Sequence, residues 1–218
     1  MNSNLEKLLI IDFGSQFTQL IGRKLRELNV FSEIIPYQNV SNKTLENYNP
    51  KAVILSGGPS SVLEKKFPVP PSNLFDLGIP VLGICYGLQV MMKLLGGKVD
   101  SGSGTSEFGR AMLKKTGRNS KIINELFIKG QEQVWMSHGD HVSGLSEGFE
   151  AIASSEGAPF AIVANDNKKL YGVQFHPEVY HTLNGLKLLN NFLLISGFSK
   201  NWSMGSFKEE KINDLKNQ

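Results

Sequence analysis

The chain contains a single cysteine, Cys85, and its neighbours place it where a thiol can act as a nucleophile. Residues 83–87 have the pattern G-x-C-x-G, between an apolar run at 81–84 and a helical pattern at 88–95. Glycines suit a sharp strand-to-helix turn, because a Cβ would clash there. The helix N-terminus also favours a thiolate. A lone cysteine is more often an inert buried side chain, but this context favours a nucleophile.

A general base for that thiol is expected at His176. The apolar residues 172–175 predict a buried strand, and Pro177 ends it because proline cannot donate to a sheet. Side chains two apart on an extended stretch point the same way, so Glu178 can face His176. The imidazole can take the thiol proton while the carboxylate orients the ring and stabilises its cation. The long sequence separation from Cys85 is no objection, since such groups meet in space.

A glycine-containing loop at 56–59, Ser-Gly-Gly-Pro, follows another apolar run. Attack on an amide produces an oxyanion, which preformed N–H groups can stabilise. The N–H of Tyr86 and one from this loop are candidates. The loop also resembles the S-G-G-x-D-S phosphate loop of ATP pyrophosphatases. Ser60 stands at its acidic position, however, and Pro59 lacks an N–H, so the oxyanion role is favoured.

The elements around these residues alternate between strand and helix patterns. The apolar runs predict strands at 8–11, 31–35, 52–55 and 81–84, with helices at 17–28 and 88–95. Repeated βαβ units predict an α/β fold, with an open, mostly parallel twisted sheet and helices on both faces. After about residue 110, short strands are predicted at 111–114, 133–136, 150–153, 161–164 and 170–175, followed by a helix at 185–195. They indicate a small antiparallel extension.

Composition bounds the class of protein. The 218 residues carry 23 Lys and Arg against 20 Asp and Glu, and no basic run indicates a nucleic-acid partner. No apolar stretch is long enough for a bilayer, and no secretory signal is evident, so a membrane is not expected. One cysteine allows neither an internal disulfide nor a zinc cage. We therefore expect a cytoplasmic location.

The three motifs together resemble the class I glutamine amidotransferase family. They are residues 56–59, residues 83–89 (GICYGLQ) and residues 172–178 (GVQFHPE). The resemblance covers most of the chain and implies a flavodoxin-like sheet. It implies that Cys85 is the nucleophile, His176 the base and Glu178 its partner. It assigns the oxyanion donors to the backbones of Gly58 and Tyr86.

The same resemblance implies that glutamine is held near Gln89, Ser137, Asp140 and Tyr180. Asp140 can pair with the α-ammonium group, and the Gln89 amide can both donate and accept hydrogen bonds. The alternative for residues 137–140 is an ordinary turn, since serine, glycine and aspartate are common turn formers.

A narrower resemblance, to the amidotransferase domains of GMP synthetases, rests on residues 12–16, 106–110, 135–140 and 202–204. It implies that ammonia passes to an ATP-pyrophosphatase synthetase domain, which uses ATP and Mg²⁺ to aminate XMP to GMP in purine biosynthesis. The glutaminase half needs no metal or organic cofactor. Since the chain has no S-G-G-x-D-S loop, the synthetase is either fused beyond it or a separate subunit. We expect an amidotransferase domain at 1–198 and a linker, partly helical, at 199–218, which favours a fused partner.

Two other functions remain open at this stage. The chain can serve a different synthase, such as one forming anthranilate or carbamoyl phosphate, with the same chemistry. It can also be a catalytically silent module that docks on a partner and regulates it.

Overall fold

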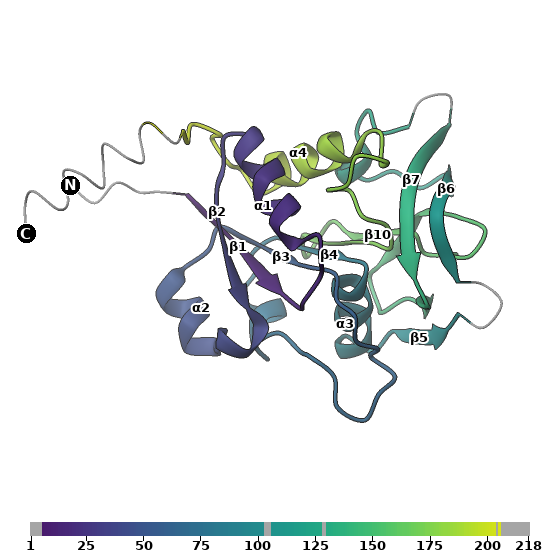
Figure 1. Ribbon diagram of the computed structural model, residues 1–218, viewed down its shortest axis with the longest axis horizontal. Coiled ribbons are helices and arrows are strands. Elements are labelled where there is room, and N and C mark those ends of the chain that lie inside the picture. Colours follow the sequence, from purple (N-terminus) through teal and green to yellow (C-terminus); the bar gives the residue numbers. More distant parts are fainter. Residues whose placement is uncertain (1–5, 103–105, 128–129, 204, 206–218) are drawn as a thin grey trace, which may run out of the picture.

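The computed structural model describes residues 6–102, 106–127, 130–203 and 205. Within these residues the centre is a nine-stranded sheet with the order β2-β1-β3-β4-β11-β10-β9-β6-β7 (Figure 1). A separate pair of strands, β5 and β8, lies beside it. The strands are β1 (Lys7–Asp12), β2 (Phe31–Pro36), β3 (Ala52–Leu55), β4 (Val81–Ile84), β5 (Lys98–Ser101), β6 (Glu107–Lys115), β7 (Gln131–His138), β8 (Asp140–Gly144), β9 (Glu150–Ser154), β10 (Ile162–Asn165) and β11 (Leu170–Val173).

Five strands, β2, β1, β3, β4 and β11, run parallel and form the α/β half of the molecule. The short apolar sequences of β1, β3, β4 and β11 suit burial on both faces, whereas β2 is the partly exposed edge strand. In β1, Leu8 and Ile10 enter one hydrophobic core, while Leu9 and Ile11 enter the other. The predicted parallel sheet is therefore confirmed.

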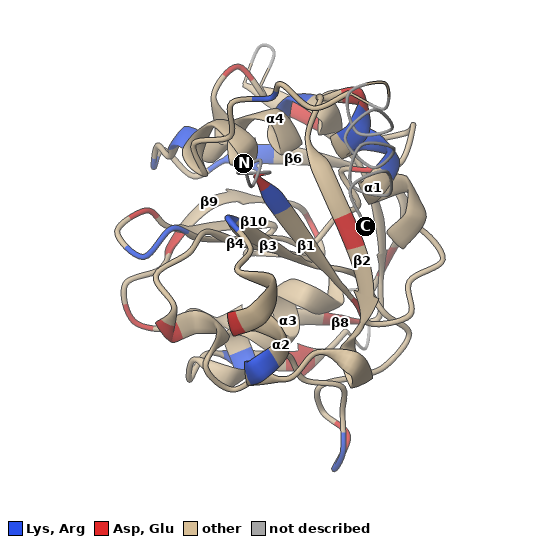
Figure 2. Cartoon of the chain, turned by 90° about the vertical axis from the view of Figure 1, so that its left-hand side faces the viewer, with Lys and Arg blue, Asp and Glu red and all other residues tan. Residues whose placement is uncertain are grey.

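Helices cover both faces of this sheet (Figures 1 and 2). Helices α1 and α4 lie on one face, and α2 and α3 lie on the other. Their bounds are α1 (Thr18–Glu27), α2 (Asn42–Tyr48), α3 (Tyr86–Leu94) and α4 (Gly185–Ile195). The short α2 was not predicted. Its signal is Ser41, whose hydroxyl accepts from the N–H of Thr44 as an N-cap.

The antiparallel part is larger than the small extension that the sequence predicted. Strands β10, β9, β6 and β7 continue the same sheet, with β11 as the boundary, parallel to β4 and antiparallel to β10. The nine-residue β6 has mostly exposed or half-buried side chains, so its apolar signal in the sequence is weak. Its length comes from pairing with β7 along eight positions.

The carboxyl ends of β1, β3, β4 and β11 meet at one edge of the sheet. Ligands bind at this edge in open α/β sheets. The glycine loop follows β3, Cys85 follows β4, and residues 174–178 follow β11. No helix in the described residues is long and apolar enough to cross a membrane. Most of the predicted linker, 204 and 206–218, lies outside the described residues.

Candidate active site

Cys85 occupies a strained turn between β4 and α3. Its φ of 51° and ψ of −107° lie in a region that side chains rarely adopt. A Cβ on Gly83 would stand 2.6 Å from the backbone of Gly87, and a Cβ on Gly87 would stand 2.3 Å from the carbonyl oxygen of Leu55. Both glycines are therefore required by close backbone packing. The turn places the sulfur at the N-terminus of α3, as the G-x-C-x-G pattern predicted.

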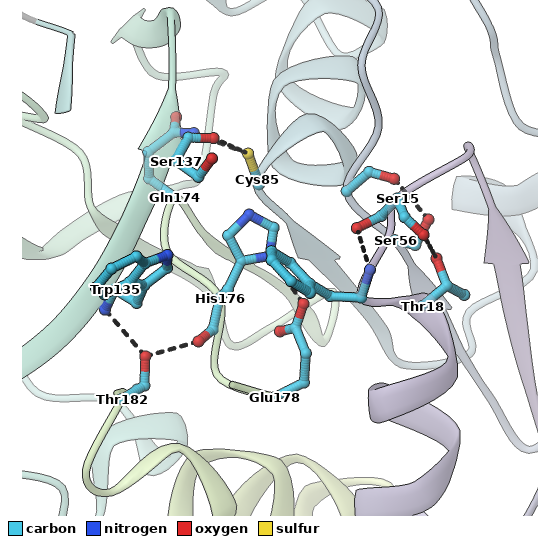
Figure 3. Close-up of polar contacts among 12 residues, drawn as sticks. Ser15, Thr18, Ser56, Cys85, Trp135, Ser137, Gln174, His176, Glu178 and Thr182 are labelled. Carbon is cyan, nitrogen blue, oxygen red and sulfur yellow. Dashed lines mark hydrogen bonds and ion pairs between the residues drawn. The ribbon is translucent and has the colours of Figure 1, made fainter. Parts of the chain in front are cut away.

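His176 and Glu178 form a buried pair beside Cys85 (Figure 3). Nδ1 of His176 lies 2.8 Å from Oε1 of Glu178. An ionised carboxylate can only accept, so Nδ1 carries a hydrogen and Nε2 is left for the thiol. The structure thus brings together the three residues that the sequence singled out.

The charge of His176 depends on its two neighbours. Burial by itself lowers the pKa of this imidazole, but hydrogen bonds and charge interactions with Cys85 and Glu178 outweigh burial and raise the pKa to about 10. The site therefore favours an imidazolium at neutral pH. An imidazolium next to a cysteine stabilises the thiolate, which is the reactive form.

Several contacts hold the imidazole in place. The Thr182 hydroxyl donates to the carbonyl of His176 at 2.6 Å and accepts from the N–H of Trp135 at 3.0 Å (Figure 3). The N–H of His176 donates back to the Trp135 carbonyl at 3.0 Å. The Phe17 ring meets the imidazole edge to face, with centroids 5.3 Å apart. The hydrogen bonds fix the main chain at His176, while Phe17 and Glu178 contact the ring itself and limit its rotation.

The glycine loop is tied to the end of β1. Phe13 donates its N–H to the Ser56 hydroxyl at 2.9 Å, and the Asp12 carboxylate accepts from Thr18 at 2.7 Å and from Ser56 at 3.4 Å. A Cβ on Gly58 would stand 2.8 Å from the carbonyl oxygen of Phe13. The loop therefore lies against β1 in a way that only glycine permits.

A cavity of about 380 Å³ opens beside the sulfur, a size that suits a small polar ligand. Besides Cys85, five residues predicted from the sequence line it, namely Gly58, Tyr86, Gln89, Ser137 and Asp140. As the first residue of α3, Tyr86 has no partner within the helix for its N–H. That N–H and the backbone of Gly58 thus lie at the cavity, beside the sulfur.

The structure refines three of the predicted ligand-binding residues. Gln89 is buried, and its amide donates to the backbone carbonyl of Asp140 at 2.7 Å. The Asp140 carboxylate accepts a hydrogen bond from Ser61. Tyr180 is 91% exposed, packs against His181 and does not line the cavity. Its role in binding glutamine stays a prediction.

Residues 137–140 connect two strands. Ser137 and His138 end β7, and Asp140 begins β8, so only Gly139 lies between them. The Ser137 carbonyl accepts from the Cys85 thiol at 3.6 Å. This segment is thus part of the cavity wall rather than a solvent-exposed turn.

Sequence reasoning assigned no role to several residues that contact the site: Phe17, Ser61, Gln174 and Thr182. Gln174 lies inside the 172–178 motif, and Phe17 follows the 12–16 motif directly. No motif or spacing in the sequence indicated that Ser61 or Thr182 would contact the site. Among the described residues, no group of three or more His, Cys, Asp or Glu side chains could hold a metal ion.

A larger cavity, of about 730 Å³, lies away from this cluster. Asp166, Lys169 and the end of α4 border it, near the amino end of β11. None of the candidate active-site residues lines this cavity, so cavity volume alone does not identify the active site.

The fold and the cluster define an α/β protein with a Cys-His-Glu site at the carboxyl edge of its sheet. Residues 9–196 match the family model for glutamine amidotransferase class-I. The chain belongs to this family.

Individual relatives agree with that assignment. The chain is 56% identical over 213 residues to "GMP synthase [glutamine-hydrolyzing]" from Cereibacter sphaeroides, a match that covers 98% of the chain and 41% of the relative. It is 51% identical to the protein of that name from Bartonella henselae, covering 96% and 40%. The chain thus spans about two fifths of the length of these curated relatives.

Solved structures share the fold. A putative GMP synthase subunit from Thermoplasma acidophilum superposes with a TM-score of 0.75 and 26% identity, covering 96% of this chain and 99% of that one. A glutamine amidotransferase from Thermotoga maritima superposes with a TM-score of 0.63 and 20% identity, covering 91% and 96%.

Proposed function

We propose that the chain hydrolyses glutamine to glutamate and ammonia through a cysteine thioester. The observation that carries the proposal is the buried Cys85, His176 and Glu178 cluster beside a cavity lined by two backbone candidates for an oxyanion site. Family membership supports the same substrate.

In the first half of the reaction, the Cys85 proton is already on Nε2 of His176, in the thiolate–imidazolium pair that the raised pKa of His176 favours. The thiolate attacks the side-chain amide carbon of glutamine, and the negative charge moves to the carbonyl oxygen. The N–H groups of Gly58 and Tyr86 stabilise that oxyanion. The C–N bond then breaks, His176 returns the proton to the nitrogen, and ammonia leaves. A γ-glutamyl thioester remains on the sulfur.

In the second half, a water molecule attacks the thioester and His176 takes its proton. A second oxyanion forms at the same N–H groups. The C–S bond breaks, glutamate leaves, and the thiolate–imidazolium pair is restored. Glu178 keeps Nδ1 protonated throughout and stabilises the imidazolium in both halves.

The cavity wall supplies groups for the amino-acid end of glutamine. The Asp140 carboxylate, which lines the cavity, is the proposed partner of the α-ammonium group. Ser137, Gln89 and the predicted residue Tyr180 are proposed contacts for the rest of that end. No metal or organic cofactor takes part in this half reaction.

We further propose that the ammonia is used to aminate XMP to GMP in purine biosynthesis. The support is the identity of 51% and 56% to proteins named as GMP synthases. The partner is an ATP-pyrophosphatase synthetase domain, fused or separate, and ATP and Mg²⁺ act there. The proposal places both halves in the cytoplasm, with neither a nucleic acid nor a membrane as partner.

A glutamine-mimicking diazo-ketone tests the glutaminase proposal. Intact mass should show one adduct, at Cys85, that excess glutamine suppresses, and Cys85→Ala should abolish both labelling and turnover. Labelling that excess glutamine does not suppress, or turnover that persists in Cys85→Ala, would contradict the proposal. Absence of any adduct in folded protein, even with the synthetase half added, would instead favour a silent regulatory module.

A further inference from the structure

A buried side-chain amide, that of Gln174, contacts the sulfur of Cys85 and has no role in the mechanism proposed above. Gln174 is 1% exposed, and its backbone N–H is held by the Ala161 carbonyl at 2.9 Å. Its side-chain Nε2 lies 3.7 Å from Sγ of Cys85. Figure 3 shows Gln174 next to Cys85 and Ser137. None of the steps above uses this contact.

The orientation of the amide follows from the network behind it. The Asp140 backbone carbonyl can only accept, so the Gln89 atom 2.7 Å from it must be the NH₂ group. The same NH₂ group lies 3.4 Å from the Gln174 side chain, so the Gln174 atom that faces it must be the carbonyl oxygen. The NH₂ group of Gln174 therefore faces the sulfur. A single carbonyl fixes the direction of both amides.

We propose that Gln174 is a catalytic residue that stabilises the Cys85 thiolate by an N–H···S hydrogen bond, and that Gln89 and the Asp140 carbonyl hold it in the donating orientation. The inference rests on the proposed glutaminase function and adds a residue to it.

The environment of the sulfur explains why such a donor is needed. In the thiol form, Cys85 donates to the Ser137 carbonyl at 3.6 Å. When the proton moves to Nε2 of His176, that carbonyl oxygen faces a negative sulfur and no longer has a hydrogen to accept. The Gln174 N–H on the same sulfur offsets this repulsion, because hydrogen bonds to charged groups are stronger than neutral ones. Gln174 thus acts on the charged form of the nucleophile.

Alkylation of Cys85 by iodoacetamide at a series of pH values tests the proposal. This small neutral probe reports the thiolate without requiring glutamine. Gln174→Met keeps the length and removes the donor, so we expect the midpoint of alkylation to move about one pH unit higher, and alkylation at pH values below the wild-type midpoint to slow about tenfold. Other titratable groups around the sulfur are His176 with Glu178 behind it, and the cavity residues Asp140, His138 and Tyr86. All of them are unchanged in the variant.

Two further variants keep the test decisive. Gln89→Met leaves Gln174 in place but removes the group that orients it, so a smaller slowing in the same direction is expected. Gln131→Met, at an exposed position at the start of β7, is the matched control and should behave as wild type. If Gln174→Met does not fold, the result for Gln89→Met decides.

Steady-state glutamine hydrolysis separates this role from simple packing. Loss of the donor should lower kcat and leave KM within about twofold, since the donor acts on the sulfur rather than on glutamine. Unchanged alkylation rates and midpoints in both Gln174→Met and Gln89→Met would overturn the proposal. If glutamine fails to protect Cys85 in wild type while Gln174→Met still slows iodoacetamide, the glutaminase function fails and the thiolate contact stands.

Discussion

Nδ1 of His176 lies 2.8 Å from Oε1 of Glu178, and neither side chain is more than 5% exposed. The second carboxylate oxygen, Oε2, is buried without a hydrogen-bond partner among the described residues. The imidazole is therefore the principal partner of this charge. Water is excluded from the pair, so the interaction is screened less than one at the surface. Together with Cys85, Glu178 raises the pKa of His176 and so determines the protonation state of the base.

Glu178→Gln is expected to lower kcat for glutamine hydrolysis by about a hundredfold or more, with little change in KM. An amide no longer stabilises the imidazolium and does not enforce a hydrogen on Nδ1. Steady-state release of glutamate measures the effect. Glu27→Gln, at a surface residue paired with Lys24, is the control and should keep full activity. A fall of less than tenfold for Glu178→Gln would contradict the proposed role.

The stability of the protein should decrease between about pH 6.5 and about pH 10 through His176. Its pKa rises from 6.5 to about 10 in the folded state. A group whose pKa is higher when folded stabilises fully below its unfolded pKa, and this contribution disappears as the pH rises through the folded pKa. Urea unfolding of wild type and His176→Asn across this range isolates the contribution. A difference that grows with pH would have the wrong sign.

Gly87→Ala should destabilise the fold by more than about 2 kcal/mol, because the added Cβ would overlap backbone. The nearest atom is the carbonyl oxygen of Leu55, at 2.3 Å, on the neighbouring strand. Gly22→Ala is the matched control. Its Cβ would meet the Ile34 side chain at 3.4 Å inside α1, so it should be neutral or slightly stabilising. Equal midpoints for both variants in urea would contradict the close packing of the turn.

Cys85→Gly should be more stable than Cys85→Ala by about 1 kcal/mol, although both are inactive. The φ of 51° at this position is tolerated by glycine and costs any residue with a Cβ. The comparison removes the thiol from both proteins and leaves only the backbone strain. Thermal unfolding of the two variants measures it. An alanine variant of equal or greater stability would show that the turn relaxes when the sulfur is absent.

Glutamine hydrolysis by this chain alone should be slow and should rise when the synthetase half is supplied. The proposed oxyanion donors are backbone groups at the cavity, and a partner that covers the cavity would complete the site and exclude water. Initial rates with and without the synthetase half provide the measurement. Equal rates would count against this expectation.

The local sequence was sufficient for the parallel strands and for the turn that carries Cys85. Four-residue apolar runs such as 52–55 and 81–84 are buried on both faces, so each has a strong signal of its own. Gly83 is likewise a local requirement of the turn, because a Cβ there would meet the backbone of Gly87, whereas Gly87 itself is required by the contact with Leu55 on the neighbouring strand. His176 and Glu178 are two residues apart, so their pairing was also visible in the chain.

Contacts between distant segments were decided only by the folded chain. The length of β6 depends on its pairing with β7, since half-buried side chains carry little periodic signal. Gln174 meets Cys85 across 89 positions, and its direction is set by a backbone carbonyl at Asp140. Hydrogen bonds of this kind depend on distances of a few tenths of an ångström, which residue types and spacing do not encode. Packing of the strand ends against one another determines them.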